Sequence, residues 1–462
     1  MAPSGEHETN RVSATGDRWR WLGVTAVALV FLAASVRLFS LIDAHAVNVL
    51  YWDQYTLFQA FVDDHGLWDW FRWQHGPHRQ GIGFWVTAWV AEATDWNARV
   101  DAFVVGGAVV VAAGLALALR MRTSGTLHAG DAAIPLLVLT PAQYGIFVHT
   151  PNLSHGAGPL LLLLLYCLAF GIEARRRRYA CVVFLDFLLI HTGFGIFVGA
   201  LTPPILVLCA WLDRSDDEGR GWQWPAAGVV LSCAWIGIFL WDYTTVGGLD
   251  DINPQGHPVA SYAIYAALMF ANVLGLKGAN WASLGLGGTA ALLAFGVAAE
   301  QGWRLLRDTP RRAEATAIVV LCGFTLLYVA TTAYGRLDYG LPGSQSTRYV
   351  PLLVPAFLGL YLRSQACQTR RVRHGFAAVA VVAMLWATIP MRPNEARFME
   401  HLSRGKQRWV ETYLETRDVA SANDRAQLEV FPHDGPEFPK VLGFMEANRL
   451  GFFAKQETPA ER

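Results

Sequence analysis

Charged residues are scarce in this chain, and net charge is absent. Only 16% of the 462 residues are charged, and 37 basic side chains balance 37 acidic ones. A neutral chain has no bulk attraction to a polyanion, so we expect no nucleic-acid partner. Hydrophobic residues make up 53% of the sequence. They recur in apolar runs of about 20 residues, the length at which a helix crosses a bilayer. The composition therefore predicts an all-α, polytopic membrane protein.

Cysteine is also scarce, and its spacing disfavours the usual cysteine-based sites. The chain has six cysteines without a CxxC pair, and none lies in a loop that we place outside the cytoplasm. A disulfide framework and a cysteine–zinc site are therefore disfavoured. We interpret the six as small buried hydrophobic residues. They are Cys167, Cys181, Cys209, Cys233, Cys322 and Cys367.

Clusters of arginine decide how the chain is threaded, because short loops rich in Lys and Arg stay in the cytoplasm. The N-terminal tail, residues 1–20, contains Arg11, Arg18 and Arg20. An apolar run without a small-residue cleavage site follows from near Trp21. We therefore predict an uncleaved signal-anchor with a cytoplasmic N-terminus. Five more basic clusters lie within residues 120–122, 175–178, 214–220, 304–312 and 363–373.

Placing all these clusters inside predicts a transmembrane helix bundle of about eleven spans, with the N-terminus inside and the C-terminus outside. Two further apolar segments, 81–93 and 261–276, do not fit as crossings. We expect them to lie along the outer face as interfacial or re-entrant helices. Gly193 and the Pro203–Pro204 pair interrupt two spans, as in broken helices that line a cavity. The expected spans are 21–42, 99–119, 132–150, 157–174, 179–192, 195–212, 225–242, 284–303, 314–333, 349–365 and 375–391.

Hydropathy falls after Arg392, which divides the chain into three parts. The N-terminal tail is followed by a transmembrane domain at 21–391, which includes a long outer loop at 43–98. Residues 392–462 are predicted to form a small extracytoplasmic appendage. Within it we expect a helix over 394–416, a short strand over 427–432 and a second helix that starts near Pro439 and runs into Leu450 to Phe453.

The expected outer loops hold most potential acids, bases, metal ligands and anion ligands, which favours a functional site outside. Asp53 is the first candidate, because it follows the first span and has Trp52 and Tyr55 beside it. A carboxylate at the headgroup boundary is partly desolvated, so we expect a raised pKa and a role as general base. The alternative is an ordinary helix-capping Asp.

His75, His78 and Arg79 form a second candidate cluster. The two histidines and Asp53 are one candidate set of ligands for a divalent metal, and the cofactor is left open. In another interpretation, Arg79 holds a phosphate to which the histidines hydrogen-bond. In a third interpretation, the histidines lie in a turn and hydrogen-bond only to the backbone or to a lipid headgroup.

A third cluster, within residues 334–349, ends with an arginine in an unusual place. Arg348 stands at the outer end of an expected span, against the positive-inside bias, so it needs an anionic partner. A lipid phosphate suits the bidentate guanidinium group. An ion pair with Asp338, or contact with lipid headgroups, is the alternative.

These features together resemble the GT-C superfamily, the polytopic glycosyltransferases that use polyprenyl-phosphate sugars, and in particular its bacterial members. The resemblance rests on Asp53-Gln54 after the first span, His75 to Arg79, Gly335-Arg336 with Ser346 to Tyr349, and Leu450 to Phe453. The paired acidic motif of several members is reduced here to Asp53, with Asp63-Asp64 further on. This departure puts metal dependence in doubt.

The resemblance implies that the chain moves a sugar from a polyprenyl-phosphate donor to an acceptor hydroxyl, with inversion, at the outer face of the plasma membrane. The acceptor would be a glycan, a lipid or a protein. Asp53 would be the catalytic base, and Arg79, Arg336 and Arg348 would bind the donor phosphate. These residues and His75 or His78 should then line one cavity bordered by the helix at 81–93. The expected supporting residues are Gln54, His75, His78, Asp338 and Tyr349.

Two other functions remain open on the sequence alone. A polymerase or ligase of undecaprenyl-linked glycans would share the outer site, but it usually has a large outer loop late in the chain. Here that loop is short. A lipid or solute transporter should place ionisable residues at the membrane midplane. Such residues are scarce apart from Asp186 and His191, and internal repeats are absent.

Overall fold

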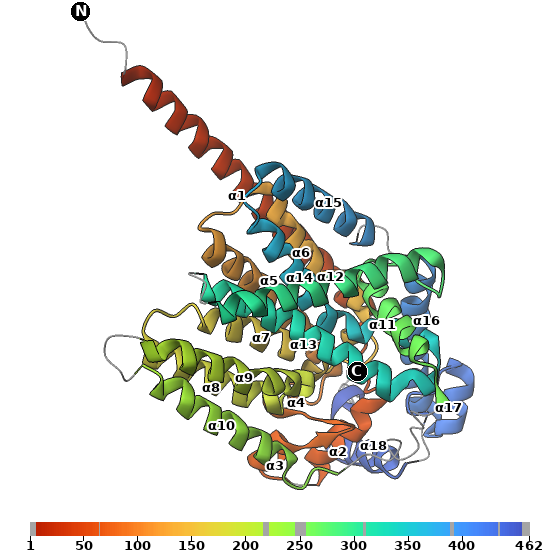
Figure 1. The fold of residues 1–462 in the computed structure, drawn as a ribbon. Coiled ribbons are helices and arrows are strands. Elements are labelled where there is room, and N and C mark those ends of the chain that lie inside the picture. Colours follow the sequence, from red (N-terminus) through yellow and green to blue (C-terminus); the bar gives the residue numbers. More distant parts are fainter. Residues whose placement is uncertain are drawn as a thin grey trace, which may run out of the picture.

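The protein is a bundle of helices, as the sequence predicted (Figure 1). The computed structural model describes residues 6–63, 65–215, 221–244, 256–307, 311–388, 392–432 and 435–454. Within these ranges the one sheet is a small hairpin of β1 (Gln74–His75) and β2 (His78–Arg79). The two strands are antiparallel, with His75 opposite His78. The all-α class is confirmed.

Six helical segments are long and apolar enough to cross a membrane, so the chain is a multi-pass membrane protein. The bent pair α15 (Arg370–Thr388) and α16 (Pro393–Thr416) would make a seventh. This criterion alone does not establish the expected eleven spans. The six lie in α1 (Glu6–His45), α5 (Ala98–Ser124), η4 with α9 (Gly193–Leu212), α10 (Gln223–Leu240), α12 (Trp281–Leu306) and α13 with η7 (Arg312–Tyr339).

Shorter helices occupy most of the other expected spans. They are α7 (Ala157–Ala169), α8 (Arg175–His191) and α14 (Val350–Gln365). The prediction of one helix over 132–150 was wrong, because α6 (Ala133–Val138) stops early and the 3₁₀ helix η2 (Pro141–Ile146) follows. Proline restricts the residue before it to an extended backbone. Thr140 accordingly has a ψ of 133°, and its hydroxyl oxygen accepts a hydrogen bond from the N–H of Ala142.

The interruption between α8 and α9 depends on one glycine. Gly193 has a φ of +55°, and a Cβ at this position would lie only 1.7 Å from the carbonyl oxygen of Ser154. A side chain is therefore excluded both by the backbone conformation and by the neighbouring chain. The break leaves Thr192 free to accept, through its hydroxyl oxygen, a hydrogen bond from the N–H of Ile82.

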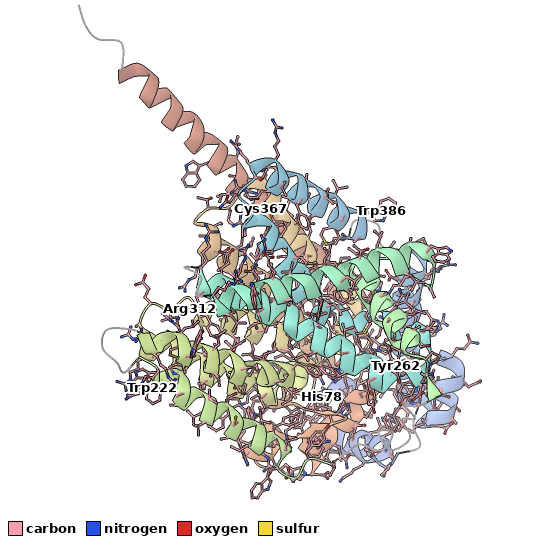
Figure 2. The ribbon with its side chains drawn as sticks, in the orientation of Figure 1. His78, Trp222, Tyr262, Arg312, Cys367 and Trp386 are labelled. Atoms are coloured by element: carbon pink, nitrogen blue, oxygen red, sulfur yellow. The ribbon has the colours of Figure 1, made fainter. Side chains whose placement is uncertain are left out.

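The arginine clusters gather at one end of the bundle, which we call the arginine end and define by Arg120, Arg312 and Arg363. Arg120 pairs with Asp131, Arg312 with Asp213, and Arg363 with Glu300. These pairs join the ends of α5, α9, α12, α13 and α14. Figure 2 shows Arg312 and Trp222 on the side of the molecule away from His78 and Tyr262.

The opposite end of the bundle carries the short helices and the C-terminal tail (Figure 1). Helices form in both apolar segments that did not fit as crossings, as α4 (Gly81–Ala93) and α11 (Val259–Val273). They are accompanied by α2 (Asp53–Val62), α3 (Leu67–Arg72), α17 (Val419–Ala426), α18 (Glu437–Ala447) and the 3₁₀ helix η10 (Gly451–Phe453).

The tail packs on the helix that begins at Asp53. The expected strand at 427–432 does not form, but the carbonyl oxygen of Val430 accepts a hydrogen bond of 2.8 Å from the N–H of Trp52. The buried ring of Tyr55 packs edge-on against Phe431 and Phe438. The tail therefore fixes the position of α2, and with it the position of Asp53.

Candidate functional site

Asp53 and Arg348 form an ion pair, although 295 positions separate them in the sequence. Asp53 is the first residue of α2, and Arg348 lies in the 3₁₀ helix η9 (Thr347–Tyr349), just before α14. One guanidinium nitrogen of Arg348, Nη1, lies 3.0 Å from the carboxylate oxygen Oδ2 of Asp53. The side chain of Asp53 is 30% exposed and that of Arg348 is 24% exposed, so the pair is accessible but partly desolvated. Arg348 thus pairs with Asp53 rather than with Asp338.

The charge on Arg348 reverses the expected pKa shift of Asp53. Burial alone raises the pKa of this carboxyl group, but the charge and hydrogen bond of Arg348, with further contributions from His75 and His149, lower it further than burial raises it. The net result is a pKa below the ordinary value. The prediction of a raised pKa was therefore wrong, because it considered desolvation without the cation. Asp53 is a carboxylate at neutral pH.

Three histidines cluster beside the ion pair. The ring of His155 lies 6.0 Å from that of His75 and 5.1 Å from that of His78, measured between centroids. Burial lowers the pKa of all three, so they are neutral at pH 7. Both ring nitrogens of His78 are buried without a hydrogen-bond partner. The cluster therefore offers neutral donors and acceptors for a polar ligand.

A metal centre is not formed by these residues. Among the described residues, no group of three or more His, Cys, Asp or Glu side chains is arranged so that it could hold a metal ion. The candidate ligand set of Asp53, His75 and His78 thus lacks the necessary convergence. His78 packs instead against Phe194, with 4.6 Å between ring centroids.

Arg79 does not belong to this site, which corrects the prediction that it binds the donor phosphate. Its side chain is buried and donates hydrogen bonds to the carbonyl oxygens of Phe239, Trp241 and Arg72. It also pairs with Asp242 at 2.9 Å. On a two-residue strand, neighbouring side chains point to opposite faces, so Arg79 turns away when His78 faces the histidines. Arg79 ties the hairpin to the C-terminus of α10.

Arg336 lies next to the histidine cluster. Its charge contributes to the lowered pKa of both His78 and His155, so the three groups are close in space. The guanidinium carbon lies 5.8 Å from the ring centroid of Tyr339. In the described part of the chain Arg336 forms no ion pair, so it remains available to an anion.

The expected supporting residues have structural partners. The side-chain oxygen of Gln54 accepts a hydrogen bond from the N–H of Tyr51, and its amide nitrogen donates one to the carbonyl oxygen of Pro151. Asp338 pairs with His257. Tyr349 is buried, with its ring 6.0 Å from that of Tyr328. These residues shape the surroundings of the ion pair.

Of the residues predicted to line one cavity, Arg348 lines a cavity of about 990 Å³ at this end of the molecule, whereas Asp53, His75, His78 and Arg336 are not among its lining residues. The interfacial helix α4 was expected to border the site, but none of its residues lines this cavity. The start of α16 and the loop that precedes α12 border it instead. The lining residues are Trp52, Tyr144, His149, Lys277, Gln345, Ser346, Thr347, Arg348, Arg392, Pro393, Asn394, Glu395, Arg397 and Phe398.

The basic residues of this cavity were mostly missed by sequence reasoning. No role is predicted for Lys277 from the sequence, and Arg392 and Arg397 fall in the predicted C-terminal tail. Their convergence depends on α16 folding back onto the bundle, for which the sequence carries no local signal. Lys406 shows how the tail is held, since its buried ammonium group donates hydrogen bonds to the carbonyl oxygens of Val148 and His149.

Comparison with known proteins does not assign this chain to a family: no protein-family model matches it, and no curated protein matches it in sequence. Fold and site therefore define the class. The chain is a helical, multi-pass membrane protein with an ionised carboxylate–arginine pair, a cluster of neutral histidines and a basic cavity at one end.

Proposed function

We propose that this protein is a glycosyltransferase that moves a sugar from a polyprenyl-phosphate donor to an acceptor hydroxyl at the outer face of the plasma membrane. The observation that carries the proposal is the Asp53–Arg348 ion pair, whose Arg348 lines the 990 Å³ cavity. The pair brings a potential base and an anion ligand to one point of an otherwise apolar protein. Such a pairing suits a reaction that develops negative charge on a leaving phosphate while a hydroxyl loses its proton.

In the proposed reaction the acceptor oxygen attacks the anomeric carbon, and a new C–O bond forms with inversion. The bond between that carbon and the phosphate oxygen breaks, and its electron pair leaves with the polyprenyl phosphate. Asp53 takes the proton of the acceptor hydroxyl, and Arg348 stabilises the charge on the departing phosphate. Binding of the donor phosphate to Arg348 would remove part of the cation's attraction for Asp53, which makes Asp53 a stronger base.

The neutral histidines and Arg336 complete the proposed site. His75, His78 and His155 would hydrogen-bond to sugar hydroxyls, which need donors and acceptors but no charge. Arg336 supplies a second cation near them. Arg79 has no role in the proposed site, because its side chain is engaged at the C-terminus of α10.

We further propose that the arginine end faces the cytoplasm and that the chain makes eleven passes. In this arrangement α1, α5, the broken segment 132–150, α7 to α10 and α12 to α15 each run between the two ends, and α11 stays at the outer end. Positive charge at the arginine end agrees with the positive-inside bias. The catalytic site then faces outward.

The proposal is tested by Asp53→Asn in membranes supplied with a radiolabelled polyprenyl-phosphate sugar. Loss of the base should reduce transfer by roughly 10²–10⁴-fold, while the protein stays folded and inserted. Asp43→Asn is the matched control, because Asp43 forms an exposed ion pair with Arg99 elsewhere on the surface. Transfer by the Asp53 variant at a near-normal rate would remove Asp53 from the mechanism.

The donor distinguishes this proposal from the polymerase or ligase alternative, which would require a diphosphate-linked oligosaccharide. The transporter alternative gains no support from Asp186. Its carboxylate is buried and accepts hydrogen bonds from the hydroxyl groups of Thr202 and Ser232, an arrangement of a packed interior. A labelled lipid that crosses liposome membranes unchanged would nevertheless favour transport over transfer.

A further inference from the structure

Three neighbouring hollows lie in series between the basic cavity and the side of the bundle, and we call this series the path. A small pocket shares Tyr144, Lys277, Arg392 and Glu395 with the 990 Å³ cavity. Its far side is lined by Gly275 and Ala387. A third hollow has a volume of about 210 Å³. Its lining includes Leu274, the sequence neighbour of Gly275, and Met384, which lies about one helical turn before Ala387. We call this third hollow the apolar groove.

The apolar groove lies between α12 and α15, both of which pack against α14 (Figure 1). Its lining is apolar except for Thr289 and Tyr361. Tyr361 directs its hydroxyl group away, to a hydrogen bond with Asp131. The α15 residues that line the groove run from Phe376 to Met384, a length of roughly 12 Å at 1.5 Å per residue. The chemistry of this lining suits a hydrocarbon chain.

The basic cavity at the end of the path has an excess of positive charge. Four cations line it, Lys277, Arg348, Arg392 and Arg397, against the single carboxylate of Glu395. Asp53 pairs with Arg348, and Glu395 lies 3.7 Å from the ammonium group of Lys277.

Arg392 stands where the cavity meets the path to the groove. In the described part of the chain it forms no ion pair. A Cβ added to Gly275 would lie 2.7 Å from its guanidinium nitrogen Nη2, which places that group directly over Gly275. An anion bound at Arg392 would therefore sit at the mouth of the apolar path.

We propose that the apolar groove and the basic cavity together bind one lipid with a phosphate headgroup, its tail between α12 and α15 and its phosphate at Arg392 and Lys277. Burial of hydrocarbon in the groove and neutralisation of the unpaired cation both favour such an occupant. The proposal rests on the proposed function only where it identifies this lipid as the donor or the released carrier. Arg392 and Lys277 then hold the phosphate beside Arg348, and Asp53 is reached from there.

The test measures binding, without any transfer reaction. Native mass spectrometry of the full chain in detergent would compare undecaprenyl phosphate, undecaprenol and inorganic phosphate as probes. Arg392→Gln should weaken binding of undecaprenyl phosphate about tenfold and leave undecaprenol unchanged, because it removes a charged hydrogen bond to the headgroup. Arg404→Gln is the matched control, because Arg404 lies on α16, the helix that begins directly after Arg392, and forms an exposed pair with Glu400.

The groove is tested separately by filling it from either wall. Ala383→Trp on α15 and Thr289→Trp on α12 should each weaken both polyprenyl probes about tenfold or more. Val382→Trp is the control, because Val382 is 66% exposed and does not line the groove. Two Trp variants from opposite walls guard against one that fails to fold.

Each outcome decides the proposal. Binding of inorganic phosphate as tight as that of undecaprenyl phosphate, with no effect of either groove variant, would assign the cavity to a free anion and overturn the lipid site. Absence of undecaprenyl phosphate binding to the wild-type protein would overturn it as well. Lipid binding with the expected variant effects, but without sugar transfer, would leave this inference standing and refute the proposed function.

Discussion

Arg348 shows what one side chain in an unusual position can reveal. An arginine at the end of a span opposite the arginine end needs a counter-charge, and the structure provides Asp53 at 3.0 Å. The sequence could predict this need, because it follows from the cost of an unpaired charge near lipid. It could not predict the sign of the pKa shift of Asp53. That sign depends on which of two opposing effects is larger, and the geometry decides it.

The pH dependence of stability should carry the signature of this pair. A carboxyl group whose pKa is lower in the folded than in the unfolded protein contributes stability above its unfolded pKa and loses it as the pH falls through its folded pKa. The ordinary value is 3.8. The difference in thermal stability between the wild type and Asp53→Asn should therefore be constant from pH 7 to 5 and shrink only around and below pH 4.

Thermal unfolding in detergent at a series of pH values measures this difference. A stability advantage of the wild type over Asp53→Asn that instead grows as the pH falls from 7 to 5 would mean that the pKa of Asp53 is raised. The pairing with Arg348 would then not dominate its electrostatics.

The β-hairpin places residues that are neighbours in the sequence in different surroundings, where they have different roles. His75, His78 and Arg79 looked like one cluster, but the register places His75 opposite His78, and Arg79 turns to α10. The partners of Arg79 are backbone carbonyl oxygens some 160 residues away, at Phe239 and Trp241. Carbonyl groups carry no sequence signature, so this role could not be predicted.

Replacement of Arg79 should therefore affect stability and not donor binding. Arg79→Gln removes the Asp242 ion pair and hydrogen bonds from a buried cation, so we expect a loss of about 3 kcal/mol. The KM for the donor should stay near that of the wild type. Arg99→Gln, which breaks an exposed pair with Asp43, is the control and should cost less than about 1 kcal/mol.

Denaturation of both variants, together with donor titrations, separates the two roles. A stable Arg79→Gln variant with a strongly raised KM would return Arg79 to the donor site.

At the scale of the whole molecule, hydropathy predicted the helical membrane class correctly. The helix class follows from apolar run lengths, and the surface helix α4 has the predicted bounds 81–93. The basic cavity could not be predicted from hydropathy, because Lys277 and Arg392 come together only when the tail folds back over the bundle. The same is true of Trp52 and Val430, whose hydrogen bond joins the loop after α1 to the tail. Contacts of this kind depend on the completed fold.

The central claim is that Asp53 and Arg348, which lie 295 positions apart in the sequence, perform different tasks in sugar transfer. The charge-swapped double variant, Asp53→Arg with Arg348→Asp, tests it most directly when thermal stability and transfer from a polyprenyl-phosphate sugar are measured on the same preparation. A swapped pair can restore the ion pair but exchanges the positions of base and anion ligand. Our account predicts a double variant more stable than either single variant, with transfer reduced by roughly 10²-fold or more. Recovery of transfer together with stability would contradict the account, because it would show that the pair only holds the fold.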